Sequence, residues 1–72
     1  MKIEYEQEHD ILNIEFLSDT EIVNSVDHNG VVIDYGENNR IVAIEVLDAS
    51  KRIHKDPLDL INFSIVRSSL PS

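Results

Sequence analysis

The sequence predicts a small α+β domain that is mostly β: an antiparallel meander of five to six strands, with one short helix after the fifth strand. Apolar and polar residues alternate with a period of two along most of the chain, which is typical of strands with one buried face. Asn-Gly at 29–30 and Asn-Asn at 38–39 interrupt this alternation and indicate tight turns. The chain has 72 residues, enough for one domain and too few for two.

The first two predicted strands form a hairpin. Ile3 and Tyr5 alternate with charged residues, and after a polar stretch Leu12, Ile14 and Phe16 alternate with polar ones. This repeat predicts two strands that share one apolar face.

A third, less regular strand carries Ile22 and Val26 and leads to Asn29-Gly30. Asn-Gly is a strong hairpin signal, because a type I′ turn needs a positive φ at both central residues. A two-residue loop at this point pairs Val26 with Ile33.

Asn38-Asn39 predicts a second two-residue turn, since asparagine tolerates the left-handed region. That turn pairs Tyr35 with Val42 and Ile33 with Ile44. A shift of one residue would move these side chains to the other face, so the agreement of pattern and turn chemistry constrains the register.

A short helix follows the fifth strand. Asp48 is predicted as its N-cap, with a carboxylate that accepts hydrogen bonds from a helix starting at Ala49. Ile53 continues the apolar side of this helix. Pro57 disfavours helical geometry at the residue before it, so the helix should stop by about Lys55.

The end of the chain allows two structures. Ile61, Phe63 and Ile65 alternate with polar residues and predict a sixth strand within 57–67, while a helix capped by Asp56 is the alternative. Residues 68–72 have little to pack against and are predicted to fray. We therefore expect a single antiparallel β domain over 1–67 and a C-terminal tail over 68–72.

One face of the predicted sheet gathers the apolar side chains. They are Ile3, Tyr5, Leu12, Ile14, Phe16, Ile22, Val26, Val31, Ile33, Tyr35, Val42, Ile44 and Val46. A two-turn helix cannot cover so wide a face, whereas sheet curvature or a second copy of the chain could. We expect a homodimer whose interface includes Ile14, Ile33, Tyr35, Val42 and Ile44.

Charge is distributed unevenly along the chain, whose net charge is −8. Residues 1–50 hold twelve carboxylates and two basic side chains, a net charge of −10, whereas residues 51–72 carry +2. Nucleic acids are disfavoured as ligands, because binding them requires Lys and Arg to neutralise phosphates. The acidity serves solubility, or it steers a basic protein partner.

The composition also favours a cytoplasmic protein. No cysteine is present, which fits a reducing compartment. The longest apolar run is four residues, Ile41–Ile44, far short of the ~20 that span a bilayer, and the charged first residues do not form a secretion signal. We expect neither membrane insertion nor export.

Several of these residues together resemble a known signature. Val32-x-Asp34-Tyr35, the run over 41–51, Asp10-x-Leu12-x-Ile14 and the upstream Tyr5 are similar to a bacterial family named domain of unknown function 2283. The resemblance covers residues 2 to about 66. That family typically has an Asp-rich turn ending in Gly where this chain has Gly36-Glu37-Asn38-Asn39, which leaves the turn type open. The resemblance implies a small bacterial sheet domain and no particular activity.

Three carboxylates on the face opposite the apolar one form a candidate site. The predicted register places Asp27, Val32 and Glu45 in one row across three strands, with Asp34 diagonal to Glu45. Such a group could bind Mg²⁺ or Ca²⁺, or raise the pKa of one carboxyl group for acid–base chemistry. A solvated polar face is the alternative interpretation.

The remaining polar residues favour no catalytic or cofactor site. His9, His28 and His54 are scattered without partners at ligand spacing, whereas a structural zinc site needs four close ligands. Asp48-Ala49-Ser50-Lys51 could form a reactive corner, but a capped helix start explains it without chemistry. No glycine-rich phosphate loop is present. We therefore predict no catalytic residues and no cofactor.

The function that the sequence favours is a non-enzymatic protein–protein interaction module. It would form a homodimer and pair with a small basic protein, in the manner of an antitoxin. Apolar residues left over on the polar face motivate a second contact; they are Ile11, Val23, Val32, Ile41 and Leu47. The rivals are a metal-dependent or acid–base enzyme that uses Asp27, Asp34 and Glu45, and a structural domain without a site.

Overall fold

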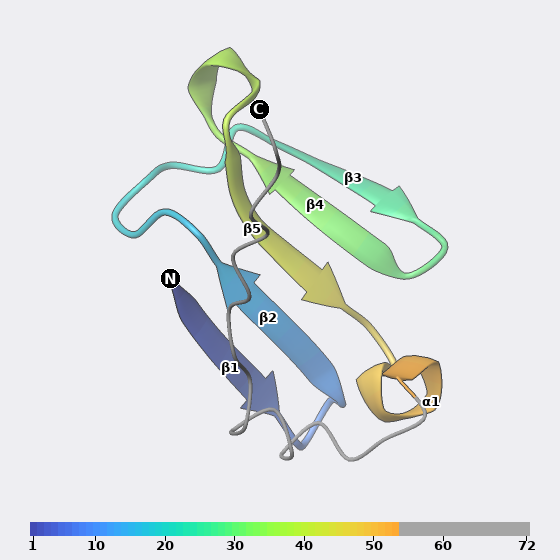
Figure 1. Ribbon diagram of the computed structural model, residues 1–72. Helices are drawn as coiled ribbons and strands as arrows, with labels where there is room; N and C mark the ends of the chain where they lie inside the picture. Colours follow the sequence, from blue (N-terminus) through green and yellow to red (C-terminus); the bar gives the residue numbers. More distant parts are fainter. Residues whose placement is uncertain (54–72) are drawn as a thin grey trace, which may run out of the picture.

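The computed structural model describes residues 1–53 and contains one five-stranded antiparallel sheet followed by a short helix (Figure 1). The elements are β1 (Lys2–Glu6), β2 (Ile11–Glu15), β3 (Asn24–His28), β4 (Val31–Tyr35), a 3₁₀ turn (Glu37–Asn39), β5 (Ile41–Val46) and α1 (Ala49–Ile53). The predicted class, mostly β with one helix after the fifth strand, is confirmed. The five strands do not form one continuous meander, however, because β2 pairs with β5 and not with β3. The sixth strand or helix predicted within 57–67, His54 and the predicted tail over 68–72 lie outside the described residues.

The strands are ordered β1-β2-β5-β4-β3. The sheet therefore combines the β1–β2 hairpin with a three-stranded β3–β4–β5 meander, and β5 pairs with both β2 and β4. Residues 16–23, which connect β2 to β3, pass the start of β5. The Val42 carbonyl accepts hydrogen bonds from the Phe16 and Leu17 amides at 2.8 and 3.2 Å.

The Asn29-Gly30 turn forms as predicted. Asn29 and Gly30 both have positive φ, 53° and 89°, as a type I′ turn requires. Val26 pairs with Ile33, which confirms the register of the β3–β4 hairpin.

The predicted pairing of Tyr35 with Val42 is wrong. Tyr35 pairs with Ile41, because the turn holds three residues, Glu37–Asn39, instead of two. A hydrogen bond of 2.8 Å from the Gly36 amide to the Arg40 carbonyl closes this turn. A β-bulge after Asp34 then absorbs the extra residue, so that the predicted pair of Ile33 and Ile44 is still formed.

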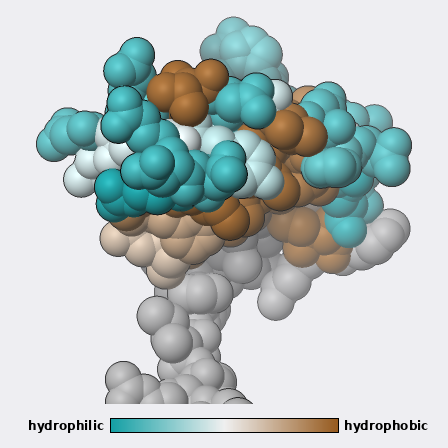
Figure 2. Space-filling view, turned by 90° about the horizontal axis from the view of Figure 1, so that it is seen from above, coloured by the Kyte–Doolittle hydropathy of each residue, from teal (hydrophilic) through white to brown (hydrophobic). Residues whose placement is uncertain are grey.

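The two faces of the sheet differ in polarity, and Figure 2 shows hydrophilic side chains along one side of the molecule and apolar ones along the other. We call them the apolar face and the polar face. One row across all five strands defines the apolar face: Ile3, Ile14, Ile44, Ile33 and Val26. The next row defines the polar face: Glu4, Asn13, Glu45, Val32 and Asp27.

The apolar face is only half-buried. Leu12 and Val42 are buried, whereas Ile14, Ile33, Ile44 and Tyr35 keep intermediate exposure. Phe16 and Ile22, both expected in the core, are 42% and 48% exposed. They lie in the connection between β2 and β3, where the alternation of the sequence continues beyond the strands.

The short helix starts at Ala49 as predicted, but Asp48 is not the residue that caps it. Asp48 has a φ of 52°, in the left-handed region, whereas an N-cap residue has extended geometry. The cap comes from Asp10 in the β1–β2 turn. Its carbonyl accepts from the Ala49 amide at 2.9 Å, and its carboxylate accepts from the Ser50 amide at 3.1 Å.

No helix within residues 1–53 is long and apolar enough to span a membrane.

Candidate functional site

The polar face brings two of the three predicted carboxylates together. Asp34 pairs with Ala43 and Glu45 pairs with Val32, so Asp34 and Glu45 are diagonal neighbours on β4 and β5, as the sequence predicted. Their side chains are close enough for one of them, when protonated, to donate a hydrogen bond to the other. Asp27 lies in the Glu45 row but is engaged elsewhere, because its carboxylate accepts a hydrogen bond of 2.8 Å from the Gly30 amide.

Asp34 is the buried member of the pair, with 4% of its surface exposed. Ser25 on the edge strand β3 lies directly opposite and donates its hydroxyl hydrogen bond to Asp34 Oδ1 at 2.6 Å. A buried carboxylate needs such partners, because removing it from water without them is costly. Ser25 thus supplies one of the partners that the Asp34 carboxylate requires.

The pKa of Glu45 is raised above its usual value. The hydrogen bond with Asp34 is the main cause, since it favours the protonated form of Glu45, and partial burial and the negative charge of Asp34 act in the same direction. Two adjacent carboxylates hold a proton between them more readily than either would alone.

A cavity of about 360 Å³ opens beside this pair. Its floor is the polar face, and its wall is the connection between β2 and β3. The lining residues are Asn13, Glu15, Leu17, Asp19, Thr20, Ile22, Asp34, Val42, Ala43 and Glu45. We call this space the acidic cavity, since four of its lining residues are carboxylates.

Asn13 contributes an acceptor that has no partner. Asn13 Oδ1 exposes less than 1 Å² and forms no hydrogen bond within the described part of the chain. Asn13 pairs with Glu45 across β2 and β5, so this oxygen belongs to the same row as the carboxylate pair. Buried polar atoms are satisfied in most native proteins, so this oxygen is an exception.

Sequence reasoning missed three residues of the cavity, Asn13, Glu15 and Asp19. Asn13 and Glu15 reach it because β2 pairs with β5, which places them opposite Glu45 and Ala43. That pairing is long-range, and the alternation pattern carries no signal for it. Asp19 belongs to an irregular connection for which the sequence offers no geometric prediction.

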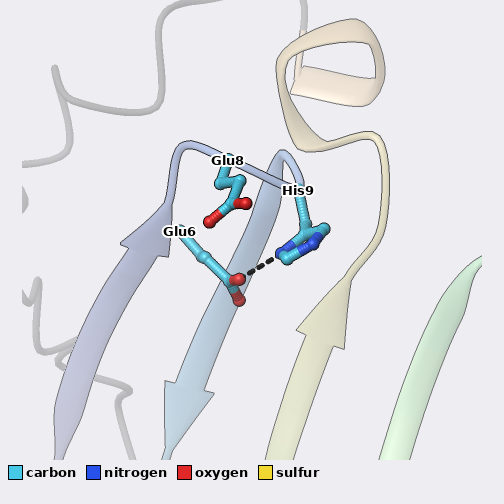
Figure 3. Close-up of side chains that lie close together, drawn as sticks. All are labelled: Glu6, Glu8 and His9. Carbon is cyan, nitrogen blue, oxygen red and sulfur yellow. Dashed lines mark hydrogen bonds and ion pairs between the residues drawn. The ribbon is translucent and has the colours of Figure 1, made fainter.

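A different group has the spacing of metal ligands. Glu6, Glu8 and His9 in the β1–β2 turn place one ligand atom each within 4.8 Å of the others, and Glu6 contacts the His9 ring (Figure 3). All three side chains are exposed, and exposed acidic groups are common without an ion. Among the described residues, Asp27, Asp34 and Glu45 do not form such a group.

Asp10 joins three separate parts of the fold. Tyr5 on β1 donates to Asp10 Oδ1 at 2.6 Å, and the Ser50 hydroxyl donates to Asp10 Oδ2 at 2.8 Å. These hydrogen bonds, led by that of Tyr5, lower the pKa of Asp10 below its usual value. The Asp48-Ala49-Ser50-Lys51 corner is therefore a helix start that is held by Asp10.

Hydrogen bonds of Asp10 join it to Tyr5 and Ser50. All three residues belong to the segments on which the sequence resemblance is based. A family model described as a protein of unknown function (DUF2283) matches residues 2–50, which include all three. The chain belongs to the DUF2283 family. Its biochemical function is unknown from this membership, as the resemblance implied.

Two curated proteins are similar to this DUF2283 chain. A protein of Methanosarcina mazei named putative hypoxanthine phosphoribosyltransferase is 38% identical over 61 residues, 85% of this chain and 49% of the relative. An uncharacterized protein of Methanocaldococcus jannaschii is 34% identical over 61 residues, 85% of this chain and 52% of the relative. The chain thus spans about half the length of the curated relatives it matches.

Both relatives are archaeal, so they do not support the bacterial origin that the resemblance predicted. No solved structure matches the chain.

Proposed function

We propose that this DUF2283 domain is a non-enzymatic protein–protein interaction module that forms a homodimer through its apolar face. One observation carries the proposal: the row of Ile3, Ile14, Ile44, Ile33 and Val26 crosses all five strands, and each of these side chains is only half-buried.

The energetics favour covering this face. Each such side chain contributes roughly 1.5–3 kcal/mol when it moves from full exposure to full burial, and the part of this transfer that belongs to its remaining exposed surface is still to be gained. Two copies packed face to face would form an aligned sandwich about 10 Å thick. A two-fold axis near Ile44 on the central strand β5 would place the row against its own copy.

Sedimentation equilibrium tests the proposal. We expect twice the chain mass for the wild type and the mass of one chain for Val26→Lys, which places a charge on the apolar face at the edge of the sheet. Val32→Lys is the matched control, because the same change on the polar face adds a cation beside Asp27 and Glu45. A wild-type monomer at high concentration, or equal effects of the two variants, would contradict the proposal.

The name of the Methanosarcina relative suggests a second function, phosphoribosyl transfer to hypoxanthine. We do not extend it to this chain. A phosphorylated substrate is attracted by basic side chains and helix N-termini, whereas residues 1–50 carry a net charge of −10. The matched region also covers only about half of that relative.

One observation favours a cation-binding or acid–base role of the polar face, namely the hydrogen bond between Asp34 and Glu45 and the raised pKa of Glu45. Calorimetric titration with Mg²⁺ and Ca²⁺ tests this second candidate. Saturable heat that disappears in Glu45→Gln would support it, and the absence of heat would exclude the metal-dependent version.

The cytoplasm is the proposed location. The 72 residues include no cysteine, so the fold does not depend on disulfides. Such a fold suits a reducing compartment, where disulfides rarely persist. Fractionation of cells with an antibody against the chain would test this assignment.

A further inference from the structure

We infer that strand β3 receives an extended segment of a basic partner protein, which adds a sixth strand to the sheet. The inference rests on the proposed function as an interaction module and deepens it by naming the chemistry of a second partner. It concerns the edge of the sheet, whereas the homodimer uses the apolar face. Three observations carry it: the open edge, the outward backbone groups of β3 and the charge beside them.

The edge at β3 is open among residues 1–53. β3 pairs with β4 on one side and forms the margin of the sheet on the other (Figure 1). Four of its five residues are exposed, and only Val26 has intermediate burial. A strand at the margin of a sheet presents N–H and C=O groups with which another chain can pair. A further strand can therefore join β3 without breaking any pair of the described sheet.

One hydrogen bond shows which backbone groups of β3 face outward. The Tyr35 carbonyl on β4 accepts from the Val23 amide, just before β3, at 2.8 Å, so the backbone of Tyr35 faces β3. Tyr35 pairs with Asn24, and pairs that face each other alternate with pairs that do not along an antiparallel ladder. Ser25 and Asp27 are therefore the β3 residues whose backbone groups face outward. An added strand would form its hydrogen bonds with these two residues.

The side chains beside those groups favour basic residues in the added strand. Ser25 and Asp27 lie on the polar face, and β3 contains no Lys or Arg. Their rows continue to Asp34 on β4 and to Glu45 on β5. A lysine or arginine opposite Asp27 would form a cross-strand pair of opposite charges, which stabilises antiparallel strands. The net charge of −10 over residues 1–50 also attracts a basic segment.

The other side of the added strand requires an apolar residue. Val26 lies between Ser25 and Asp27 and belongs to the apolar face, where it pairs with Ile33. An apolar residue opposite Val26 would extend that row by one member. The partner segment therefore alternates, with basic side chains opposite Ser25 and Asp27 and an apolar side chain opposite Val26.

The edge at β1 does not offer the same site. Lys2 on β1 forms an ion pair of 3.7 Å with Glu4, so it neutralises that carboxylate and would repel a basic segment. Lysine on an edge strand is also one of the features that protect an edge from pairing. β3 contains neither Lys nor Pro, and its register with β4 has no bulge. The charges of the two edges thus favour β3.

An NMR titration of the full chain, labelled with ¹⁵N, tests the inference with the blocked peptide acetyl-Thr-Lys-Val-Lys-Thr-amide. We expect saturable shifts and slower hydrogen exchange of the Ser25 and Asp27 amides, because these amides would become hydrogen-bonded. The matched peptide with Glu in place of both Lys should bind about tenfold more weakly, since like charges would lie opposite each other. Equal binding of the two peptides, or no saturable shift in β3, would overturn the inference.

A third peptide separates strand addition from charge attraction alone. It has the same sequence with both lysine amides N-methylated, so it keeps the charge and loses the N–H groups that would face Ser25 and Asp27. We expect no saturable shift in β3 with this peptide. Binding equal to that of the unmethylated peptide would show that charge acts without strand pairing and would contradict the inference.

A pair of charge-neutralising variants locates the site. Asp27→Asn should weaken peptide binding about three- to fivefold, the size of an exposed ion pair, while its side chain can still accept the hydrogen bond of the Gly30 amide. Glu4→Gln removes the same charge from the other edge and should change binding less than about 1.5-fold. Equal weakening in both variants would indicate general surface attraction and contradict the inference.

The homodimer and strand addition are read from different measurements. Ile3→Lys places a charge on the apolar face at the β1 edge, so it should dissociate the homodimer in sedimentation and leave the peptide shifts in β3 unchanged. A wild-type monomer that still binds the peptide would contradict the homodimer and support strand addition. A wild-type dimer without peptide binding would overturn strand addition alone. A mass above two chains that Asp27→Asn lowers would show that a further copy occupies β3 and contradict a basic partner there.

Discussion

Asp10 holds the start of helix α1 although it lies about 40 residues away in the sequence. Its carboxylate accepts hydrogen bonds from Tyr5 and from the amide and hydroxyl of Ser50, all at 2.6–3.1 Å. A single aspartate therefore connects strand β1, the first turn and the helix.

Asp10→Asn should lower the melting temperature by several degrees, because the amide cannot accept all of these hydrogen bonds. Asp48→Asn is the matched control, since asparagine tolerates the left-handed geometry of that position. Thermal unfolding followed by circular dichroism measures both variants. A larger loss in Asp48→Asn would restore Asp48 as the cap and contradict the structure.

Asp10 also predicts how acid destabilises the domain. Its pKa in the folded chain is lower than the ordinary value of 3.8, so the ionised form contributes stability that is fully present above pH 3.8. This contribution is lost as the pH falls through the lowered pKa. Urea unfolding between pH 2 and pH 5 should show a steeper acid limb in the wild type than in Asp10→Asn.

Glu45 predicts the opposite dependence of folding stability on pH. Its pKa is raised above the ordinary value of 4.5, so the folded chain holds a proton that the unfolded chain releases. Stability associated with this proton is present below pH 4.5 and is lost as the pH rises through the raised pKa. Glu45→Gln should remove that loss, and a parallel pH profile in the variant and the wild type would contradict the shared proton.

At the scale of the elements, the β3–β4 hairpin depends on one glycine. Gly30 has a φ of 89°, and a Cβ there would also meet the end of the Arg52 side chain, which contacts the Asn29 carbonyl. Gly30→Ala should destabilise the domain by about 1–3 kcal/mol through backbone strain. Gly30→Asn should cost less, since asparagine enters the left-handed region more readily. Equal urea midpoints for the two variants would show that strain is not the cause.

The two turns explain how far local sequence predicts this sheet. Asn29-Gly30 permits one loop length, so its register followed from the sequence. Asn38 and Asn39, both at φ 59°, fit a two-residue or a three-residue turn, and the choice depends on a bulge in the partner strand. Turn chemistry alone does not predict a bulge that neighbouring strands stabilise.

The candidate site likewise contains residues that local sequence could predict and residues that it could not. Asp34 and Glu45 lie on strands joined by a short turn, so their proximity could be predicted. Asn13 and Glu15 reach the cavity through the pairing of β2 with β5, and Asp10 reaches Ser50 through the position of α1 at the end of the sheet. Such long-range neighbours are decided by packing of the whole chain, which periodicity does not encode.

At the scale of the whole molecule, assembly should make stability depend on concentration. If only the folded chain dimerises, the melting temperature should rise by a few degrees between about 5 and 500 μM protein. Val26→Lys should melt at the same temperature across this range, and Val32→Lys should behave as the wild type does. Differential scanning calorimetry measures these values, and a wild-type melting temperature independent of concentration would exclude the dimer.

The central position of β5 also has a consequence for how the chain folds. When the ribosome has released only residues 1–40, the β1–β2 and β3–β4 hairpins cannot become one sheet. The strand that lies between them, β5, has not yet been synthesised. Pairing β2 with β5 then closes a loop of roughly 30 residues, an entropic cost that makes this step slow compared with the local turns. Until β5 emerges, the edges of both hairpins stay open to other chains.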